Sequence, residues 1–311
     1  MISLAKDLLH SIAERALSPV ASRHLRNIFL LGHDRSGSTW IASTLGLAAD
    51  AIYLHEPMNE SSSRAGNWEL YNTYLGRGED SPDHAKVYDP AAKGFGVKRL
   101  SLREWKIRLF SHPSIIIKET GGMLLGEWFE ERYGGRILAL IRHPAPVILS
   151  NIAMDADNAG RWFEALKRQR PVADVPGFAA KLTSIDVRDP VQTFAAVYCV
   201  RYEILLDQLE CHPQWMLLRY EDFAADPVAE FRRLFASVGF DFTPEVEREV
   251  GRRCSSEGPE SFFGTERNSR AVLTRWKSKV DRDMERRIRR VLEEFSFPLY
   301  NSASDWDSAR G

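Results

Sequence analysis

The sequence predicts an α/β fold with a doubly wound, mainly parallel sheet. One observation is a set of short, continuous apolar runs, which are typical of strands buried on both faces. Another is that segments of helical periodicity separate several of these runs, which favours parallel strands joined by helical crossovers. The predicted strands are 27–31, 52–54, 115–117, 137–141 and 215–218, and the helices between them are 40–49, 122–133 and 145–154.

Capping residues predict further helices toward the C-terminus. An Asp or Thr followed by proline is typical of a helix start, because the side chain caps the first turn and proline fits the first helical position. This pattern predicts helices over about 190–210, 227–238 and 244–253, and periodicity predicts another over 282–295. The arginines of that last helix are expected to form a solvated face with i,i+4 pairs rather than a phosphate site. Residues 1–25 carry one apolar stripe and predict an amphipathic helix packed on the domain, with a membrane-surface helix as the alternative.

Composition excludes several classes of protein. The 311 residues are 44% hydrophobic and 27% charged, as in globular proteins, and the net charge of −1 argues against a dedicated nucleic-acid binder. No apolar run is long enough to span a bilayer, and charged residues interrupt the N-terminal apolar stripe, unlike a signal peptide. Three cysteines without C-x-x-C spacing favour a reducing compartment. We therefore expect a cytoplasmic protein, with its oligomeric state open.

The chain is expected to form one domain over residues 1–311, with two insertions that break the alternation of strands and helices. These insertions, 58–113 and 155–188, are rich in Gly, Ser, Pro and charge, yet they hold several Trp and Tyr residues. Loops of this length are usually functional lids or contain short helices of their own. The two segments are therefore candidate lids over a substrate site, although their aromatic residues are also consistent with a small core beneath each loop.

A glycine-containing loop follows the first predicted strand and precedes a helix. Residues 32–39, GHDRSGST, have the G-x-x-x-x-G frame of a P-loop in the required strand–loop–helix context. Gly37 lets backbone N–H groups turn toward a phosphate, and the helix adds its positive end. Ser38 stands where the Walker lysine of nucleoside triphosphatases would follow, which argues against ordinary ATP or GTP hydrolysis. The loop carries Arg35 instead, and it predicts an architecture like that of a nucleotide kinase.

A second motif lies about 100 residues further on, where Arg142 ends a strand and Ser150 follows eight residues later in a helix. A guanidinium and a hydroxyl in this arrangement are suited to one phosphate. Residues 35–40, RSGSTW, resemble the 5′-phosphosulfate loop of sulfotransferases that use 3′-phosphoadenosine 5′-phosphosulfate (PAPS), and residues 141–151 resemble the 3′-phosphate motif of that family. The resemblance covers roughly 26–57, 114–154 and 214–223, with a looser match near 262–280.

This resemblance implies PAPS as donor and adenosine 3′,5′-bisphosphate (PAP) as product. It implies that Trp40 stacks on the adenine, unless it is a core tryptophan, and that Tyr220 of the L-R-Y-E-D segment contacts the adenine. The stretch near 267–277 lies where the family's C-terminal loop closes over the nucleotide, with Ser269 and Arg270 as candidates, unless it is a plain surface loop. The implied nucleotide-binding residues are Arg35, Ser36, Gly37, Ser38, Thr39, Trp40, Arg142, Ser150, Tyr220, Ser269 and Arg270.

Sulfuryl transfer needs cations for the leaving oxygen and a base for the acceptor proton. The candidate cations are Arg35 and Lys118, and Ser269 is a further catalytic candidate. The cytosolic enzymes of the family have K-x-H after the third strand, whereas this sequence has Thr120 in place of that histidine. The E-P segment at Glu56 instead resembles the carbohydrate type, so Glu56 is the predicted base.

We expect burial to raise the pKa of Glu56 toward working pH. His55 is its immediate rival as the base, and Glu119 is a weaker one. A purely structural pairing of the Glu56 carboxylate with Arg35 or Lys118 is the alternative to catalysis.

The sequence predicts no metal site, because its eight histidines and three cysteines lack ligand spacing. The predicted acceptor is a small molecule, carbohydrate or phenol that offers a hydroxyl, with an amine second. Two alternatives stay open: a small-molecule kinase with an atypical P-loop, and a non-catalytic nucleotide-binding protein of the same fold.

Overall fold

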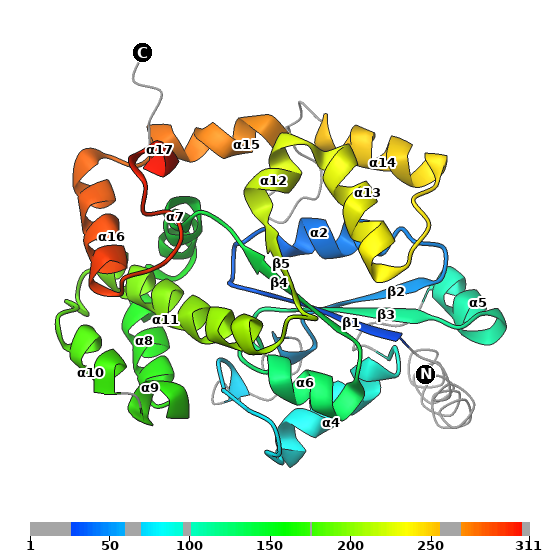
Figure 1. Ribbon diagram of the computed structural model, residues 1–311, viewed down its shortest axis with the longest axis horizontal. Coiled ribbons are helices and arrows are strands. Elements are labelled where there is room, and N and C mark those ends of the chain that lie inside the picture. Colours follow the sequence, from blue (N-terminus) through cyan, green and yellow to red (C-terminus); the bar gives the residue numbers. More distant parts are fainter. Residues whose placement is uncertain (1–25, 60–69, 96–100, 175, 256–268, 307–311) are drawn as a thin grey trace, which may run out of the picture.

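The computed structural model describes residues 26–59, 70–95, 101–174, 176–255 and 269–306. Five parallel strands form one sheet in the order β2-β3-β1-β4-β5 (Figure 1). All five predicted strands are confirmed, and they are β1 (Arg26–Gly32), β2 (Ala51–His55), β3 (Ser114–Glu119), β4 (Arg136–Ile141) and β5 (Met216–Arg219). The parallel α/β fold predicted from the sequence is therefore correct.

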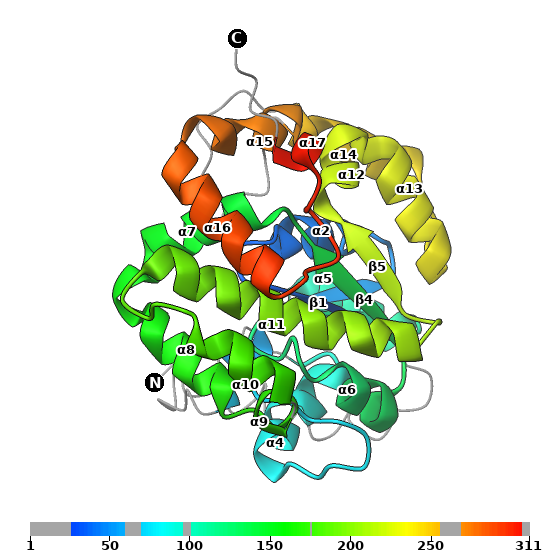
Figure 2. The ribbon, with the colours of Figure 1, turned by 60° about the vertical axis from the view of Figure 1, so that its left-hand side comes forward.

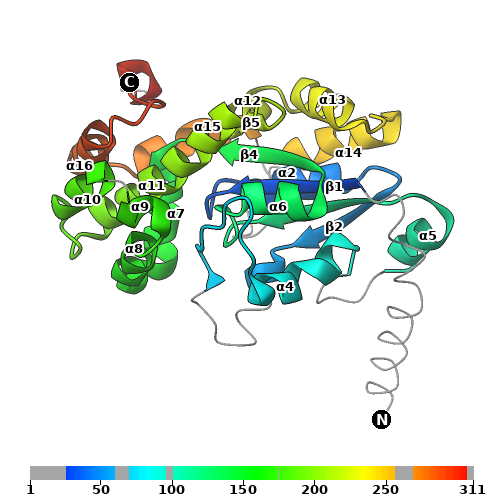
Figure 3. The ribbon, with the colours of Figure 1, turned by 60° about the horizontal axis from the view of Figure 1, so that its bottom comes forward.

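Helices cover both faces of the sheet, and alternate strand residues face opposite layers. In β1, Phe29 and Leu31 belong to one apolar cluster, whereas Ile28 and Leu30 belong to the other. The first cluster includes residues of α6 (Gly126–Tyr133), α7 (Pro144–Asp155) and α11 (Pro190–Cys211). The second includes residues of α2 (Ser38–Leu45), α12 (Tyr220–Ala225), α13 (Pro227–Val238) and α14 (Pro244–Cys254). Figure 3 shows the sheet between these two layers.

The helix starts predicted from capping residues are confirmed. The side chains of Asp189, Asp226 and Thr243 accept hydrogen bonds from the first turns of α11, α13 and α14. The last predicted helix is α16 (Arg282–Glu294), and its arginines pair with acidic neighbours three or four residues away, as expected of a solvated face. The prediction missed the short α12, and it extended α2 beyond its end at Leu45.

Both insertions contain short helices of their own. The first holds α4 (Pro82–Ala92) and α5 (Leu102–Phe110), and the second holds η2 (Ala156–Asn158), α8 (Ala159–Lys167), α9 (Arg170–Asp174) and α10 (Pro176–Thr183). Helices α8 to α10 lie beside α11, as Figure 2 shows. The helix predicted over residues 1–25 lies outside the described residues. Within the described part of the chain, no helix has the length and apolar character needed to cross a membrane.

The position of β1 between β3 and β4 determines where loops can meet. The chain passes from β1 to β2 and β3 on one side of the sheet, and then crosses to β4 and β5 on the other. Ligands of open α/β sheets bind beyond the carboxyl ends of the strands at such a reversal. The loop after β1 and the loop after β4 are therefore neighbours, although they are far apart in the sequence.

Candidate active site

The loop after β1 has the backbone of an anion-binding turn. Gly37 caps α2 with a left-handed conformation, at a φ of 92°, and no side chain caps this helix end. The first N–H groups of a helix have no intrahelical acceptor, so those of α2 are directed toward the loop. The Tyr220 ring lies against Gly37 so closely that a Cβ at this position would collide with it. Glycine is therefore required here by both the backbone angle and the contact.

The two phosphate motifs meet at Arg35. The Arg35 Nε donates a hydrogen bond of 2.7 Å to the Ser150 Oγ of α7, and the Arg142 Nη1 donates one of 3.2 Å to the Arg35 carbonyl oxygen. The Arg142 guanidinium also lies over the Tyr220 ring, 4.2 Å from its centre. The structure thus brings together Arg35, Arg142, Ser150 and Tyr220 as predicted from the sequence.

Glu56 and Lys118 form a buried ion pair at the ends of β2 and β3. Glu56 has a positive φ of 43°, and its backbone N–H donates to the Lys118 carbonyl oxygen at 2.8 Å. The Glu56 carboxylate also accepts hydrogen bonds from the Thr120 Oγ1 at 3.0 Å and the Asn59 Nδ2 at 2.9 Å. The carboxylate is therefore held in one orientation by three side chains.

The expected rise in the pKa of Glu56 is wrong. Burial does favour the neutral carboxyl, but the charge and hydrogen bond of Lys118 and the hydrogen bond of Asn59 outweigh it, and the pKa of Glu56 lies below its usual value. The sequence alone could not predict the direction of this pKa shift, because the direction depends on which residue of β3 faces the end of β2. Glu56 is a carboxylate at neutral pH, which is the form that a general base requires.

The two rivals for the base have different surroundings. The His55 Nδ1 lies 2.9 Å from the Tyr53 hydroxyl, and its Nε2 is 3.9 Å from the Glu56 carboxylate. Glu119 is fully buried, and its carboxylate accepts the backbone N–H groups of Met58, Thr120 and Gly121 at 3.0 to 3.1 Å. Burial, together with the charge of Glu56, raises the pKa of Glu119 to about 7. Glu119 therefore ties the loop after β2 to the loop after β3.

A buried network that the sequence analysis missed lies behind the P-loop. Asp34 accepts hydrogen bonds from the Arg201 Nη1 of α11 at 2.9 Å and from the Tyr71 hydroxyl at 2.8 Å. Arg201 is fully buried and also donates to the Thr120 carbonyl oxygen. Although burial favours the neutral acid, the charge of Arg201 holds the pKa of Asp34 below its usual value. The arginine stands mid-helix among apolar residues, which was the available signal.

The chain is similar in sequence and in fold to known proteins. No family model matches the chain. Among solved structures, mouse sulfotransferase SULT7A1 complexed with PAP is 13% identical, over 95% of this chain and 94% of its own, with a TM-score of 0.46. Carbohydrate sulfotransferase 4 of Mus musculus is 23% identical, and the match covers 86% of this chain and 80% of the relative. Carbohydrate sulfotransferase 5 of Mus musculus is 28% identical, over 51% of this chain and 38% of the relative. The sequence matches to carbohydrate sulfotransferases support a PAPS-dependent sulfotransferase.

A cavity of about 290 Å³ in this sulfotransferase has a donor set that fits a nucleotide phosphate. Arg142, Arg219 and Lys277 line it, together with Tyr220 and residues 272–274 of α15 (Ser269–Arg275). Glu221 and Asp305 also line the cavity, so its three cations leave a net positive charge, which suits an anion such as PAP. Arg219, which the sequence analysis did not select, thus joins the candidate nucleotide-binding residues.

Three predicted nucleotide contacts, Trp40, Ser269 and Arg270, are not among the residues that line this cavity. Trp40 is fully buried and packs edge-on against Tyr220 and Phe231, so it is a core side chain of this structure, and its stacking on adenine stays a prediction. Arg270 is exposed, and its Nε contacts the Ala225 carbonyl oxygen at 3.4 Å. Ser269 begins α15, and its roles in binding and catalysis also stay predictions.

A larger cavity, of about 670 Å³, lies between the two insertions of the sulfotransferase. Tyr71 and Asn72 of the first insertion form one wall, and residues 155–169 of the second form the other. The Tyr71 hydroxyl lies 3.1 Å from the Thr120 Oγ1, which itself donates to Glu56. The cavity is therefore connected to Glu56 through the contact between Tyr71 and Thr120, and the role of the two insertions as acceptor-site lids stays a prediction.

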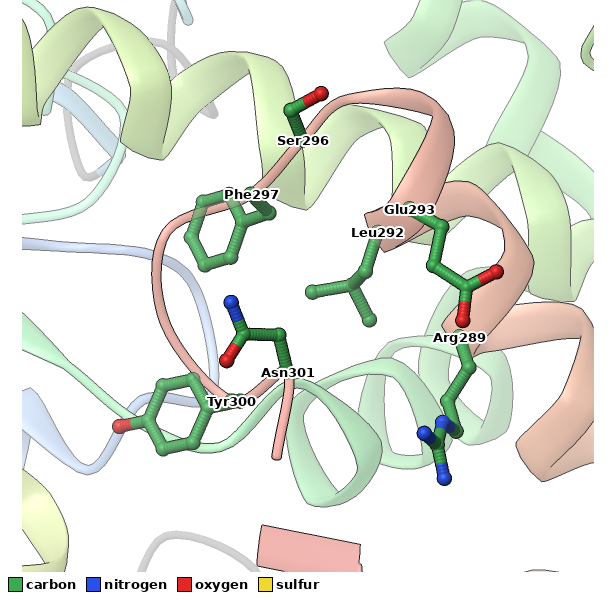
Figure 4. Close-up of a pocket in the computed structure, with 7 residues that line it drawn as sticks. All are labelled: Arg289, Leu292, Glu293, Ser296, Phe297, Tyr300 and Asn301. Carbon is green, nitrogen blue, oxygen red and sulfur yellow. The ribbon is translucent and has the colours of Figure 1, made fainter. Parts of the chain in front are cut away.

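A further cavity, of about 300 Å³, lies at the C-terminal end of the sulfotransferase, between α16 and the segment that follows it (Figure 4). Leu292 and Phe297 point toward Asn301 across it, whereas the Tyr300 hydroxyl points away and donates to Glu221 at 2.9 Å. Neither Glu56 nor Arg35 lines this cavity, whereas Tyr300 lines both this cavity and the one that contains Arg142. Among the described residues, no group of three or more His, Cys, Asp or Glu side chains is arranged to hold a metal ion.

Proposed function

We propose that this sulfotransferase transfers the sulfuryl group of PAPS to an acceptor hydroxyl by in-line displacement, with Glu56 as the general base. The observation that carries the proposal is that the Glu56–Lys118 pair and the P-loop arginine lie at the carboxyl ends of β2, β3 and β1, which are adjacent strands. The names of the relatives support a carbohydrate as the acceptor. An amine is the less favoured acceptor.

In the proposed reaction, the acceptor oxygen attacks sulfur as the bond from sulfur to the 5′-phosphate oxygen of PAPS breaks. Glu56 takes the proton of the hydroxyl, and PAP leaves with the electron pair of the broken bond. The new ester therefore carries the sulfuryl group, and no further reactant is needed. Arg35 and the N-terminus of α2 stabilise the charge that develops on the departing oxygen.

In this scheme Lys118 interacts first with Glu56 and then with the leaving oxygen of PAPS, so the ion pair takes part in catalysis. In the structure it neutralises Glu56 and lowers the pKa of that carboxyl. When Lys118 turns to the leaving oxygen, Glu56 loses its counter-charge and becomes more basic. Proton removal is thereby favoured at the stage at which charge leaves with PAP.

Ligand binding and transfer test the proposal together. Thermal shift should show strong stabilisation by PAP, weaker stabilisation by adenosine 5′-phosphate, and little by ATP with Mg²⁺. Mass spectrometry should then detect sulfated products when the protein is incubated with PAPS and a panel of carbohydrates and phenols. Stabilisation by ATP with Mg²⁺ but not by PAP would favour the kinase alternative, whereas PAP binding without transfer to any acceptor would favour the non-catalytic one.

A further inference from the structure

The cavity between the two insertions carries cations that the proposed reaction does not use. Arg161 of α8 and Arg168, which follows its last turn, both line this cavity. They are seven residues apart, so they lie on the same helix face, separated by about 10 Å. Both are exposed, and neither guanidinium has a hydrogen bond or ion pair with another described residue.

The acidic residues of the cavity already have partners within the chain. The two oxygens of Asp155 accept one hydrogen bond each, from the Asn158 Nδ2 at 2.6 Å and the Trp162 Nε1 at 2.8 Å. Glu164 pairs with Lys167 at 3.0 Å. Asp155 keeps its negative charge because both of its donors are neutral, but the two arginines outnumber it, so the net charge of the cavity is positive.

A buried polar atom on the opposite wall also points to a ligand. Asn72 is 3% exposed and lines the cavity, and its Oδ1 has no hydrogen-bond partner among the described residues. A buried carbonyl oxygen without a donor costs free energy, so such groups usually bind water or a ligand. A hydroxyl or amide N–H of a bound molecule would satisfy it. The cavity thus combines two cationic donors on one wall with an acceptor on the other.

We propose that the acceptor of this enzyme is an acidic molecule, with a carboxylate, phosphate or sulfate group bound by Arg161 and Arg168. The inference rests on the proposed function, because it assigns this cavity to the acceptor. Tyr71 supports that assignment, since it lines the cavity, donates a hydrogen bond to Asp34 of the P-loop, and lies 3.1 Å from the Thr120 Oγ1 that donates to Glu56. An acid held by α8 leaves the rest of the molecule to extend past Asn72 toward Glu56.

Acceptors that differ only in an acidic group test whether the cavity prefers an acidic acceptor. One pair tests a carboxylate and a second pair tests a phosphate. For a carboxylate, transfer from PAPS is compared between 4-nitrophenyl β-D-glucuronide and 4-nitrophenyl β-D-glucoside. For a phosphate, it is compared between glucose 1-phosphate and methyl glucoside. We expect the acidic member of at least one pair to have a kcat/KM about tenfold or more above that of its neutral partner, as one charge-assisted contact allows.

Variants of the two arginines connect this preference to the cavity. R161Q/R168Q should raise the KM for the acidic acceptor about tenfold, with kcat and the neutral acceptor nearly unchanged, because neither arginine touches the reacting atoms. R161K/R168K should restore part of the preference. R188Q removes the same charge from an exposed arginine that pairs with Asp186 outside the cavity, and it should change nothing.

Three outcomes would overturn the inference while PAP still binds: neutral acceptors that react as well as acidic ones, a double variant that keeps the preference, or acidic acceptors that all fail to react. Failure of the protein to bind PAP would instead overturn the proposed function, and this inference with it.

Discussion

The side chains of Arg35 and Ser150 are joined by a hydrogen bond of 2.7 Å, although they are 115 residues apart in the sequence. Arg35 belongs to the loop after β1, and Ser150 belongs to α7, which follows β4. Since β1 and β4 are neighbouring parallel strands, their carboxyl ends place the two motifs side by side. The residues implied to bind the 5′-phosphosulfate and those implied to bind the 3′-phosphate therefore form one continuous donor surface.

This surface predicts that the enzyme distinguishes PAP from adenosine 5′-phosphate through Arg142. R142A should weaken PAP binding by about ten- to a hundred-fold, since it removes a charge-assisted contact to the 3′-phosphate. Adenosine 5′-phosphate lacks that phosphate and should bind almost equally to both proteins. Calorimetry with the two nucleotides measures this, and an equal loss for both would contradict the role of Arg142.

The Glu56–Lys118 pair predicts a split between turnover and binding. E56Q keeps the size of the side chain but cannot accept a proton, so kcat should fall by about 10²- to 10⁴-fold while PAP affinity stays nearly constant. H55A is the matched control, and it should retain most of the turnover because His55 hydrogen-bonds to Tyr53 and its Nε2 lies 3.9 Å from the Glu56 carboxylate, beyond hydrogen-bond distance. If H55A abolishes turnover and E56Q keeps more than about a tenth of it, His55 is the base.

Removal of metal ions tests whether protein cations alone stabilise the charge on the leaving group. Transfer should proceed in excess EDTA, because Arg35 and Lys118 take the part that Mg²⁺ has in phosphoryl transfer by kinases. The measurement is the initial rate of product formation with and without EDTA, repeated after addition of Mg²⁺. A strict requirement for Mg²⁺ would support the kinase alternative.

The buried Glu119 predicts a pH dependence of stability. Its pKa is raised from 4.5 to about 7, so the folded state binds more protons than the unfolded state between these values. The free energy of unfolding should therefore fall by up to about 3 kcal/mol as pH rises from 4.5 to 7, and then level off. Urea unfolding across this range should show the slope in the natural protein and not in E119Q. An identical slope in both proteins would mean that another group is responsible.

The ion pair of Asp34 and Arg201 predicts a large effect on stability. D34N leaves the fully buried guanidinium without its counter-charge, which should lower the free energy of unfolding by about 3–5 kcal/mol. D83N is the control, because it breaks an exposed pair with Lys86 and should leave the unfolding midpoint almost unchanged. Similar midpoints for the two variants in urea would show that the buried pair is not important for stability.

The sequence by itself determined the strands, most helix starts and the two phosphate motifs of this protein. Each of these features depends on residues close together in the chain. The apolar run 27–31 identified β1, and the side chain of Asp189 identified the start of α11. The loop that contains Gly37 was recognised from the spacing of its own glycines between a strand and a helix. Local patterns of this kind report burial and capping directly.

Only the tertiary structure decided the electrostatics of the site. The partner of Glu56 is Lys118 of a different strand, and that contact reversed the expected direction of the pKa shift. The counter-charge of Asp34 is Arg201 of α11, and the cavity with Arg161 and Arg168 exists because the two insertions face each other. A charge responds to every group within a few ångströms, whatever its place in the chain, so its pKa and its partners follow from the packing of distant segments.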